Sequence, residues 1–77
     1  LKNVRVTDKT QAQNDADVRA MVERAAKELG TDGRILVRES GTEPLVRVMV
    51  EAGNVETCEK YVDAVIDVIR SKGYVIE

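Results

Sequence analysis

The sequence predicts an α+β domain in which two helices cover one face of a mostly antiparallel sheet, in the order β-α-β-β-α. Two stripes of apolar residues follow the helical period, and two β-branched segments flank a short loop that contains glycine and proline. The chain has 77 residues, of which 43% are hydrophobic and 34% charged, as in one small globular domain. We therefore expect residues 1–77 to form a single domain.

The first half of the chain predicts one strand and one helix. Residues 4–6 alternate apolar and polar side chains, which predicts a half-buried strand with both valines facing the core. A helix capped by Asn14 or Asp15 should follow, because six apolar residues recur at helical spacing: Val18, Met21, Val22, Ala25, Ala26 and Leu29. Gly30 should end it, since glycine readily adopts the left-handed conformation beyond a last turn.

The middle of the chain predicts a hairpin of strands 34–38 and 45–51. We expect Arg38 to face Leu45, which aligns two apolar pairs on the core face: Ile35 with Val48, and Val37 with Val46. Arg38 and Arg47 are then diagonal neighbours on the other face, about 7–8 Å apart at the backbone. That uncovered face should carry Arg34, Leu36, Arg38, Leu45, Arg47 and Met49. Its apolar members favour partial cover by another domain.

The last third predicts a second helix that Asn54 caps and Gly73 ends. Its apolar stripe comprises Val55, Cys58, Val62, Val65, Ile66 and Ile69. Cys58 should pack as a small hydrophobe, because the chain has no histidine to activate a thiol. Residues 74–76 could add a short final strand.

Charge and composition exclude several classes. A net charge of −2 and a pI near 5.2 argue against a nucleic-acid surface. One cysteine and no histidine exclude an internal disulfide and argue against a zinc site, which suits a cytoplasmic protein. No apolar run approaches the roughly 20 residues of a membrane span. The chain lacks an initiator Met, so we expect a domain of a longer protein.

The loop between the two middle strands indicates an anion site. Arg38, Ser40, Gly41, Thr42 and Arg47 offer two guanidinium groups, two hydroxyls and a glycine amide, and a phosphate accepts several such bonds at once. No nucleophile–base pair is evident, so we expect no catalytic residue in this chain. The alternative is a simple turn beside two surface arginines, with Glu39, Glu43 or Glu51 as carboxylate partners.

Residues 33–51 closely resemble the C-terminal domain of the α-D-phosphohexomutases. Within that superfamily, the motif Arg-x-Ser-Gly-Thr-Glu-Pro-x-x-Arg-Val-Met-Val-Glu, from Arg38 to Glu51, is most similar to that of the bacterial phosphoglucosamine mutases. The resemblance implies a fold like that of the TATA-box-binding protein, in a mobile domain that closes over the substrate. It also implies that Arg38, Ser40, Gly41, Thr42 and Arg47 bind the substrate phosphate that is not being transferred.

The resemblance further implies a parent enzyme of four domains that interconverts glucosamine 6-phosphate and glucosamine 1-phosphate. Its phosphoserine, Mg²⁺ ion and sugar-selecting segments belong to the other domains, and its product feeds UDP-N-acetylglucosamine and cell-wall synthesis. This chain alone should then be inactive, with a phosphosugar and the parent's other domains as partners, and with neither nucleic acid nor membrane among them.

Two other classes remain open. The order β-α-β-β-α-β also fits a ferredoxin-like, non-enzymatic module that binds an anion or regulates a partner. A structural or oligomerising domain could use the partly apolar sheet face. An RNA-binding sheet is disfavoured because Tyr61 and Tyr74, the aromatic residues, lie outside the two middle strands.

Overall fold

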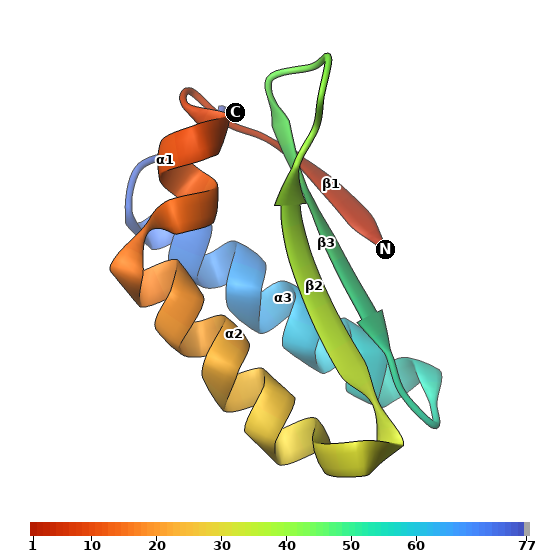
Figure 1. Ribbon diagram of the computed structural model, residues 1–77. Helices are drawn as coiled ribbons and strands as arrows, with labels where there is room; N and C mark the ends of the chain where they lie inside the picture. Colours follow the sequence, from red (N-terminus) through yellow and green to blue (C-terminus); the bar gives the residue numbers. More distant parts are fainter. Residues whose placement is uncertain (77) are drawn as a thin grey trace.

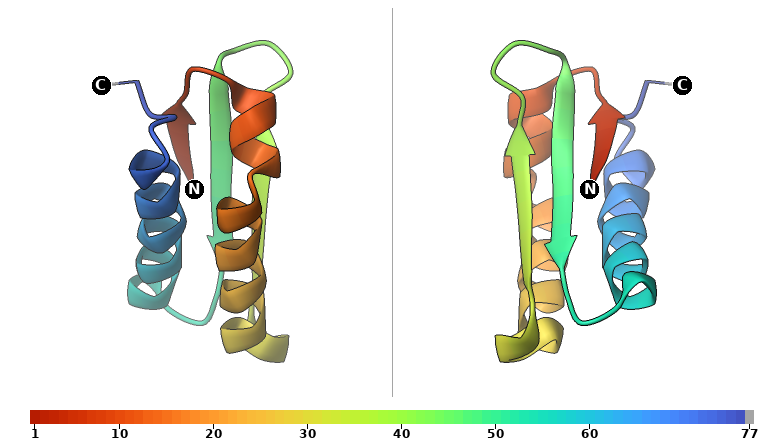
Figure 2. Two further views of the ribbon diagram at one scale, coloured as in Figure 1. Left: turned by 90° about the vertical axis from the view of Figure 1, so that its left-hand side faces the viewer. Right: turned by 90° about the vertical axis from the view of Figure 1, so that its right-hand side faces the viewer.

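The computed structural model describes residues 1–76 and shows a three-stranded antiparallel sheet with three α-helices packed on one face. The elements are β1 (Lys2–Arg5), α1 (Lys9–Asn14), α2 (Ala16–Leu29), the 3₁₀ turn η1 (Gly30–Asp32), β2 (Arg34–Glu39), β3 (Leu45–Glu51) and α3 (Val55–Ser71). The strand order β1-β3-β2 makes β3 central, and the helices lie together on one side of the sheet (Figures 1 and 2). The α+β class is confirmed, whereas the expected number of two helices is wrong.

Helix α1 is the element that the sequence pattern did not predict. It is six residues long and buries a single side chain, Ala12, so it has no apolar stripe. Asp8 caps it by accepting a hydrogen bond from the Gln11 N–H at 3.0 Å. An Asp followed three residues later by Gln is a helix-start signature that could have revealed it.

Asp15 separates α1 from α2 and starts the longer helix. Its extended backbone, with φ −57° and ψ 134°, prevents one continuous helix. Its carboxylate accepts from the N–H groups of Asp17 at 2.9 Å and Val18 at 3.3 Å. Gly30 follows the last turn with φ +60°, so both predicted ends of this helix are confirmed.

Helix α3 has the predicted caps. Asn54 accepts from the Thr57 N–H at 2.8 Å, and Gly73 lies just beyond the helix with φ +82°. The predicted stripes each contain one error, because Ala26 is exposed and Val55 is 71% exposed. Ala26 lies at the edge of its stripe, where a helix turns its side chains toward solvent, whereas Val55 is exposed because it is the first residue of α3.

The core lies between the sheet and the helices. Sheet residues that point into it, together with Val6 just beyond β1, are Val4, Ile35, Val37, Val46, Val48 and Val50. Helix residues that meet them include Ala12, Val18, Ala25, Leu29, Tyr61, Val62, Val65, Ile66 and Ile69. Cys58 is half-buried against this cluster, as expected of a small hydrophobe.

The hairpin register differs by two residues from the expected one. Arg38 lies opposite Arg47, and not opposite Leu45. The pairing extends because Ser40 donates its N–H to the Leu45 carbonyl at 2.9 Å, which shortens the loop. A shift of two residues preserves which side chains share a face, so the predicted apolar face is retained although its cross-strand pairs are different.

The uncovered face of the sheet is partly apolar, as expected. Leu36 and Met49 are half-buried there. Leu45 departs from the prediction, because it is only 5% exposed and yet lies outside the core cluster. It sits opposite Arg5 on β1, at the end of the sheet that bears the loop.

The predicted final strand is reduced to one bridge between Val75 and Val6. The Thr7 N–H donates to the Tyr74 carbonyl at 2.9 Å, and the Ile76 N–H donates to the Arg5 carbonyl at 3.0 Å. These bonds hold the last described residues beside the end of β1. The bridge is too short to count as a strand of the sheet.

Candidate functional site: an anion-binding hairpin loop

The loop between β2 and β3 is shaped at its base by Ser40. This residue is only 4% exposed, and its Oγ accepts from the N–H groups of Thr42 at 3.4 Å and Glu43 at 3.3 Å. Leu45 donates its N–H to the Glu43 carbonyl at 2.8 Å and does not return the bond that it receives from Ser40. Residues 41–44 therefore project as an exposed turn beyond the last pair of strand residues.

Arg38 and Arg47 lie side by side at the foot of this turn. Residues directly opposite each other on antiparallel strands have Cβ atoms about 4.5–5.5 Å apart. Within residues 1–76, no carboxylate lies at ion-pair distance from either guanidinium. Glu51 accepts two hydrogen bonds of 3.1 Å from Arg34, and Glu39 accepts one of 2.6 Å from the Thr10 hydroxyl of helix α1. Two like charges are thus held together without a carboxylate counter-ion among the described residues.

Backbone and hydroxyl donors of the loop are also unpartnered. In the described part of the chain, neither the Gly41 N–H nor the Thr42 hydroxyl has a hydrogen-bond acceptor. The space around Gly41 is open, since an added Cβ would meet no atom within 4 Å. The structure therefore gathers four of the five predicted residues as exposed donors and places the fifth, Ser40, beneath them.

Three residues of helix α1 form hydrogen bonds with the end of β2 and the start of the loop. Lys9 Nζ donates to the Ser40 carbonyl at 2.6 Å. The Gln13 side-chain oxygen accepts from the Glu39 N–H at 2.6 Å, and the Thr10 hydroxyl donates to the Glu39 carboxylate at 2.6 Å. Sequence reasoning missed these contacts because it did not predict α1.

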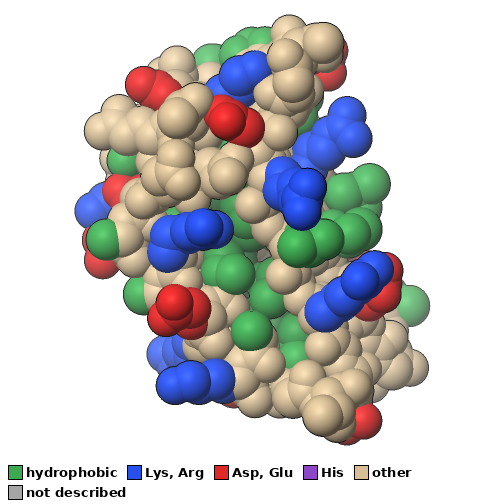
Figure 3. Space-filling view, in the orientation of Figure 1, with side chains coloured by type: hydrophobic (Ala, Val, Ile, Leu, Met, Phe, Trp, Pro, Cys, Tyr) green, Lys and Arg blue, Asp and Glu red, His purple; other side chains and the backbone are tan. Residues whose placement is uncertain are grey.

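A third cation, Arg5, extends the basic surface of the uncovered sheet face. Its register opposite Leu45 makes it a diagonal neighbour of Arg47, about 7–8 Å away at the backbone. On the side of the molecule where β2 and β3 run, Figure 3 shows Lys and Arg side chains interspersed with hydrophobic ones. The loop thus sits at the end of a partly apolar face on which Arg5, Arg38 and Arg47 form no ion pair within residues 1–76.

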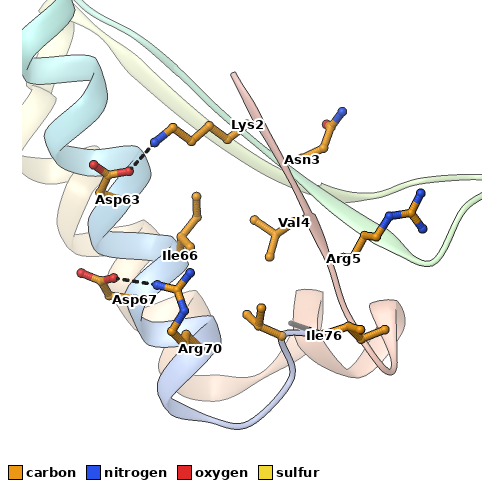
Figure 4. Close-up of a pocket in the computed structure, with 10 residues that line it drawn as sticks. Lys2, Asn3, Val4, Arg5, Asp63, Ile66, Asp67, Arg70 and Ile76 are labelled. Carbon is orange, nitrogen blue, oxygen red and sulfur yellow. Dashed lines mark hydrogen bonds and ion pairs between the residues drawn. The ribbon is translucent and has the colours of Figure 1, made fainter.

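A separate hollow of about 710 Å³ lies between β1 and α3. Its wall carries two ion pairs, Lys2–Asp63 at 2.8 Å and Arg70–Asp67 at 3.4 Å. Figure 4 shows both pairs along the helix, with Arg5 pointing away from them. Two of the three cations that line this hollow, Lys2 and Arg70, have carboxylate partners, unlike Arg38 and Arg47 within residues 1–76.

The clear pKa shifts arise from contacts that join elements of the fold. The Tyr74 hydroxyl donates to Asp15 at 2.8 Å, which lowers the pKa of that carboxyl and raises the pKa of the phenol. Glu51 raises the pKa of Arg34 by hydrogen bonding. None of these four groups lines the loop, and the Arg34–Glu51 pair joins the ends of β2 and β3 that lie away from it.

The described residues contain no group of three or more His, Cys, Asp or Glu side chains that could hold a metal ion. No helix within residues 1–76 combines the length and apolarity of a membrane span. The guanidinium, amide and hydroxyl donors of the loop are groups that can bind an anion.

Comparison with known proteins gives a consistent assignment. Residues 1–68 match the family described as phosphoglucomutase/phosphomannomutase, C-terminal domain. The chain is 79% identical to the phosphoglucosamine mutase of Lachnospira eligens over 76 residues, which cover 99% of this chain and 17% of that protein. It is 53% identical to the phosphoglucosamine mutase of Bacillus subtilis over 72 residues, or 94% of this chain and 16% of that protein. The chain therefore belongs to the family of phosphoglucomutase/phosphomannomutase C-terminal domains.

Proposed function

We propose that this chain is the substrate-phosphate-binding domain of a phosphoglucosamine mutase. The observation that carries the proposal is a cluster of donors at one hairpin that have no acceptor within residues 1–76: the guanidinium groups of Arg38 and Arg47, the Gly41 N–H and the Thr42 hydroxyl. A phosphate dianion can accept from all of them and also neutralise the paired arginines. Ser40 contributes by folding the turn that presents these donors.

In the parent enzyme, this site would hold the phosphate that is not being transferred during interconversion of glucosamine 6-phosphate and glucosamine 1-phosphate. A clamp on the remote phosphate fixes the sugar so that its reacting oxygen stays in line with the phosphoserine. Both substrates present a similar dianion to the clamp, so one site can serve both orientations. The product would supply UDP-N-acetylglucosamine for the cell wall.

The remaining parts of the machinery would lie outside this chain. The chain spans about 17% of the length of its relative from Lachnospira eligens, which leaves room for further domains. We assign the phosphoserine and the Mg²⁺ site to those domains, and we place the enzyme in the cytoplasm. Mg²⁺ there would stabilise charge on the transferred phosphoryl group, while this chain binds and orients the other end of the substrate.

Titration of the ¹⁵N-labelled 77-residue chain with inorganic phosphate tests the binding site. We expect the amide resonances of Gly41 and Thr42 to move first, with a dissociation constant near the millimolar scale because the other domains are missing. Arg38→Ala and Arg47→Ala should weaken the response. Arg34→Ala is the matched control, since it removes the same charge from the same sheet face but from a residue paired with Glu51.

The same titration separates the proposal from its alternatives. Equal losses in all three variants would show a diffuse charge effect and would remove the support for a clamp. Phosphate binding at the loop, together with no mutase turnover by the full-length parent protein, would favour a non-enzymatic anion-binding module.

A further inference from the structure

The peptide between Ser40 and Gly41 has its carbonyl bound from one side and its N–H free on the other. Lys9 Nζ donates to the Ser40 carbonyl at 2.6 Å in a partly buried contact. The described chain has no cis peptide bond, and in a planar trans peptide the C=O and N–H point in opposite directions. The bond from Lys9 therefore directs the Gly41 N–H away from helix α1.

This use of the carbonyl replaces a bond that the hairpin would otherwise make. Ser40 donates its N–H to the Leu45 carbonyl, as in a hydrogen-bonded antiparallel pair. In such a pair the Leu45 N–H would return a bond to the Ser40 carbonyl. It donates to the Glu43 carbonyl instead, at 2.8 Å, which leaves the Ser40 carbonyl to Lys9.

Helix α1 also fixes the strand end that precedes this peptide. Glu39 is the last residue of the edge strand β2, and its N–H donates to the Gln13 side-chain oxygen at 2.6 Å. The Thr10 hydroxyl binds the Glu39 carboxylate. With these contacts on one side and the Leu45 carbonyl on the other, the residues leading into the turn are held on both sides.

We propose that Lys9 is a positioning residue that sets the direction of the Gly41 N–H toward a bound phosphate, with Gln13 holding the adjacent backbone. The benefit to ligand binding rests on the proposed function, whereas the orientation of the amide does not. Lys9 binds the loop backbone, so its proposed effect on a ligand passes through the geometry of Gly41.

The test uses Lys9→Met, which keeps the chain length of the side chain and removes the donor, and Lys9→Arg, which restores a donor. Lys2→Met is the charge-matched control, because Lys2 pairs with Asp63 in the separate hollow beside α3. The first measurement is the residual dipolar coupling of the Gly41 N–H without phosphate. We expect Lys9→Met to change this coupling, and Lys9→Arg and Lys2→Met to leave it close to the value of the unsubstituted 77-residue chain.

The second measurement is the dissociation constant for inorganic phosphate at 0.15 M salt, where long-range charge effects are screened beyond about 8 Å. We expect Lys9→Met to weaken binding by about three- to tenfold, the effect of one misdirected donor, and Lys9→Arg to recover most of it. A Gly41 coupling that is the same in Lys9→Met as in the parent chain would overturn the proposal. Equal weakening in Lys9→Met and Lys2→Met would also overturn it.

Failure of the proposed function gives a different result. If the unsubstituted 77-residue chain shows no phosphate response at residues 38–47, the proposed assignment of the phosphate site is wrong. A changed Gly41 coupling in Lys9→Met would still support the positioning role of Lys9 in the loop.

Discussion

Arg38 and Arg47 face each other across the β2–β3 pair, and within residues 1–76 neither has a carboxylate at ion-pair distance. Like charges directly opposite on adjacent strands destabilise a sheet. The fold retains the two cations at the foot of an exposed turn whose amide and hydroxyl donors are also unpartnered. A dianion bound between them, as proposed, would relieve this repulsion.

Replacing either arginine should therefore change stability and binding in opposite directions. We expect Arg38→Ala and Arg47→Ala to leave the free energy of unfolding unchanged or raise it by up to about 0.5 kcal/mol in phosphate-free buffer. The same variants should bind phosphate more weakly. Urea denaturation with and without phosphate measures both effects, and a clear loss of stability without phosphate would mean that these side chains support the fold.

In the full-length parent enzyme, Arg47→Ala should raise KM and lower kcat/KM. Loss of one charge-assisted bond to phosphate should reduce kcat/KM by about ten- to a hundredfold, or roughly 1.5–3 kcal/mol. Steady-state assays with glucosamine 6-phosphate provide the measurement, with Arg34→Ala as control. Kinetics that match those of the parent enzyme would show that Arg47 is an ordinary surface arginine.

The 77-residue chain alone should fold and show no mutase activity. No described residue forms a metal-binding cluster, and we assign the phosphoserine to other domains. Circular dichroism checks the fold, and a coupled assay with added Mg²⁺ checks turnover. Metal-dependent conversion of glucosamine 6-phosphate by the purified chain would contradict this division of roles.

Replacement by alanine should affect stability at Gly33 and phosphate binding at Gly41. A Cβ on Gly33 would collide with the Glu51 carbonyl, whereas a Cβ on Gly41 would point into open space. Gly33→Ala should reduce stability by about 1–3 kcal/mol. Gly41→Ala should change stability by less than about 0.5 kcal/mol, and yet weaken phosphate binding at least about threefold, because the methyl group crowds an anion held at its N–H. Unaltered phosphate binding in Gly41→Ala would exclude this amide from the site.

Acid stability should depend on the bond between Tyr74 and Asp15. This bond lowers the pKa of the Asp15 carboxyl, so its contribution is present above the ordinary pKa of about 4 and is lost as pH falls through the lowered value. Tyr74→Phe should therefore make the free energy of unfolding less dependent on pH below about 5. Urea denaturation between pH 2.5 and 7 tests this, and parallel curves for the two proteins would contradict it.

In alkali, the contribution of this bond to the free energy of unfolding is lost as pH rises, and not as it falls. It raises the pKa of the Tyr74 phenol, so that contribution is complete below about pH 10 and disappears as pH rises through the raised value. Asp15→Asn serves as the companion variant, because it keeps a capping side chain for α2 but removes the titrating group. Tyr74→Phe and Asp15→Asn should both make the free energy of unfolding less dependent on pH below about 5.

The sequence by itself determined the elements whose signals are local. Helical periodicity and the caps at Asp15, Asn54, Gly30 and Gly73 predicted α2 and α3. Strand alternation predicted which valines face the core, and the run from Arg38 to Arg47 predicted where donors would gather. Such signals depend on neighbouring residues in the chain, so they can be recognised without the rest of the fold.

Tertiary structure decided the features that depend on contacts between distant segments. Helix α1 has one buried residue and no stripe, and it is held in place by its bonds to Glu39 and Ser40. The hairpin register was set by how Ser40 closes the turn, which moved Arg47 from diagonal to directly opposite Arg38. The contact of Lys9 with the loop joins residues 31 positions apart, so only the folded chain brings them together.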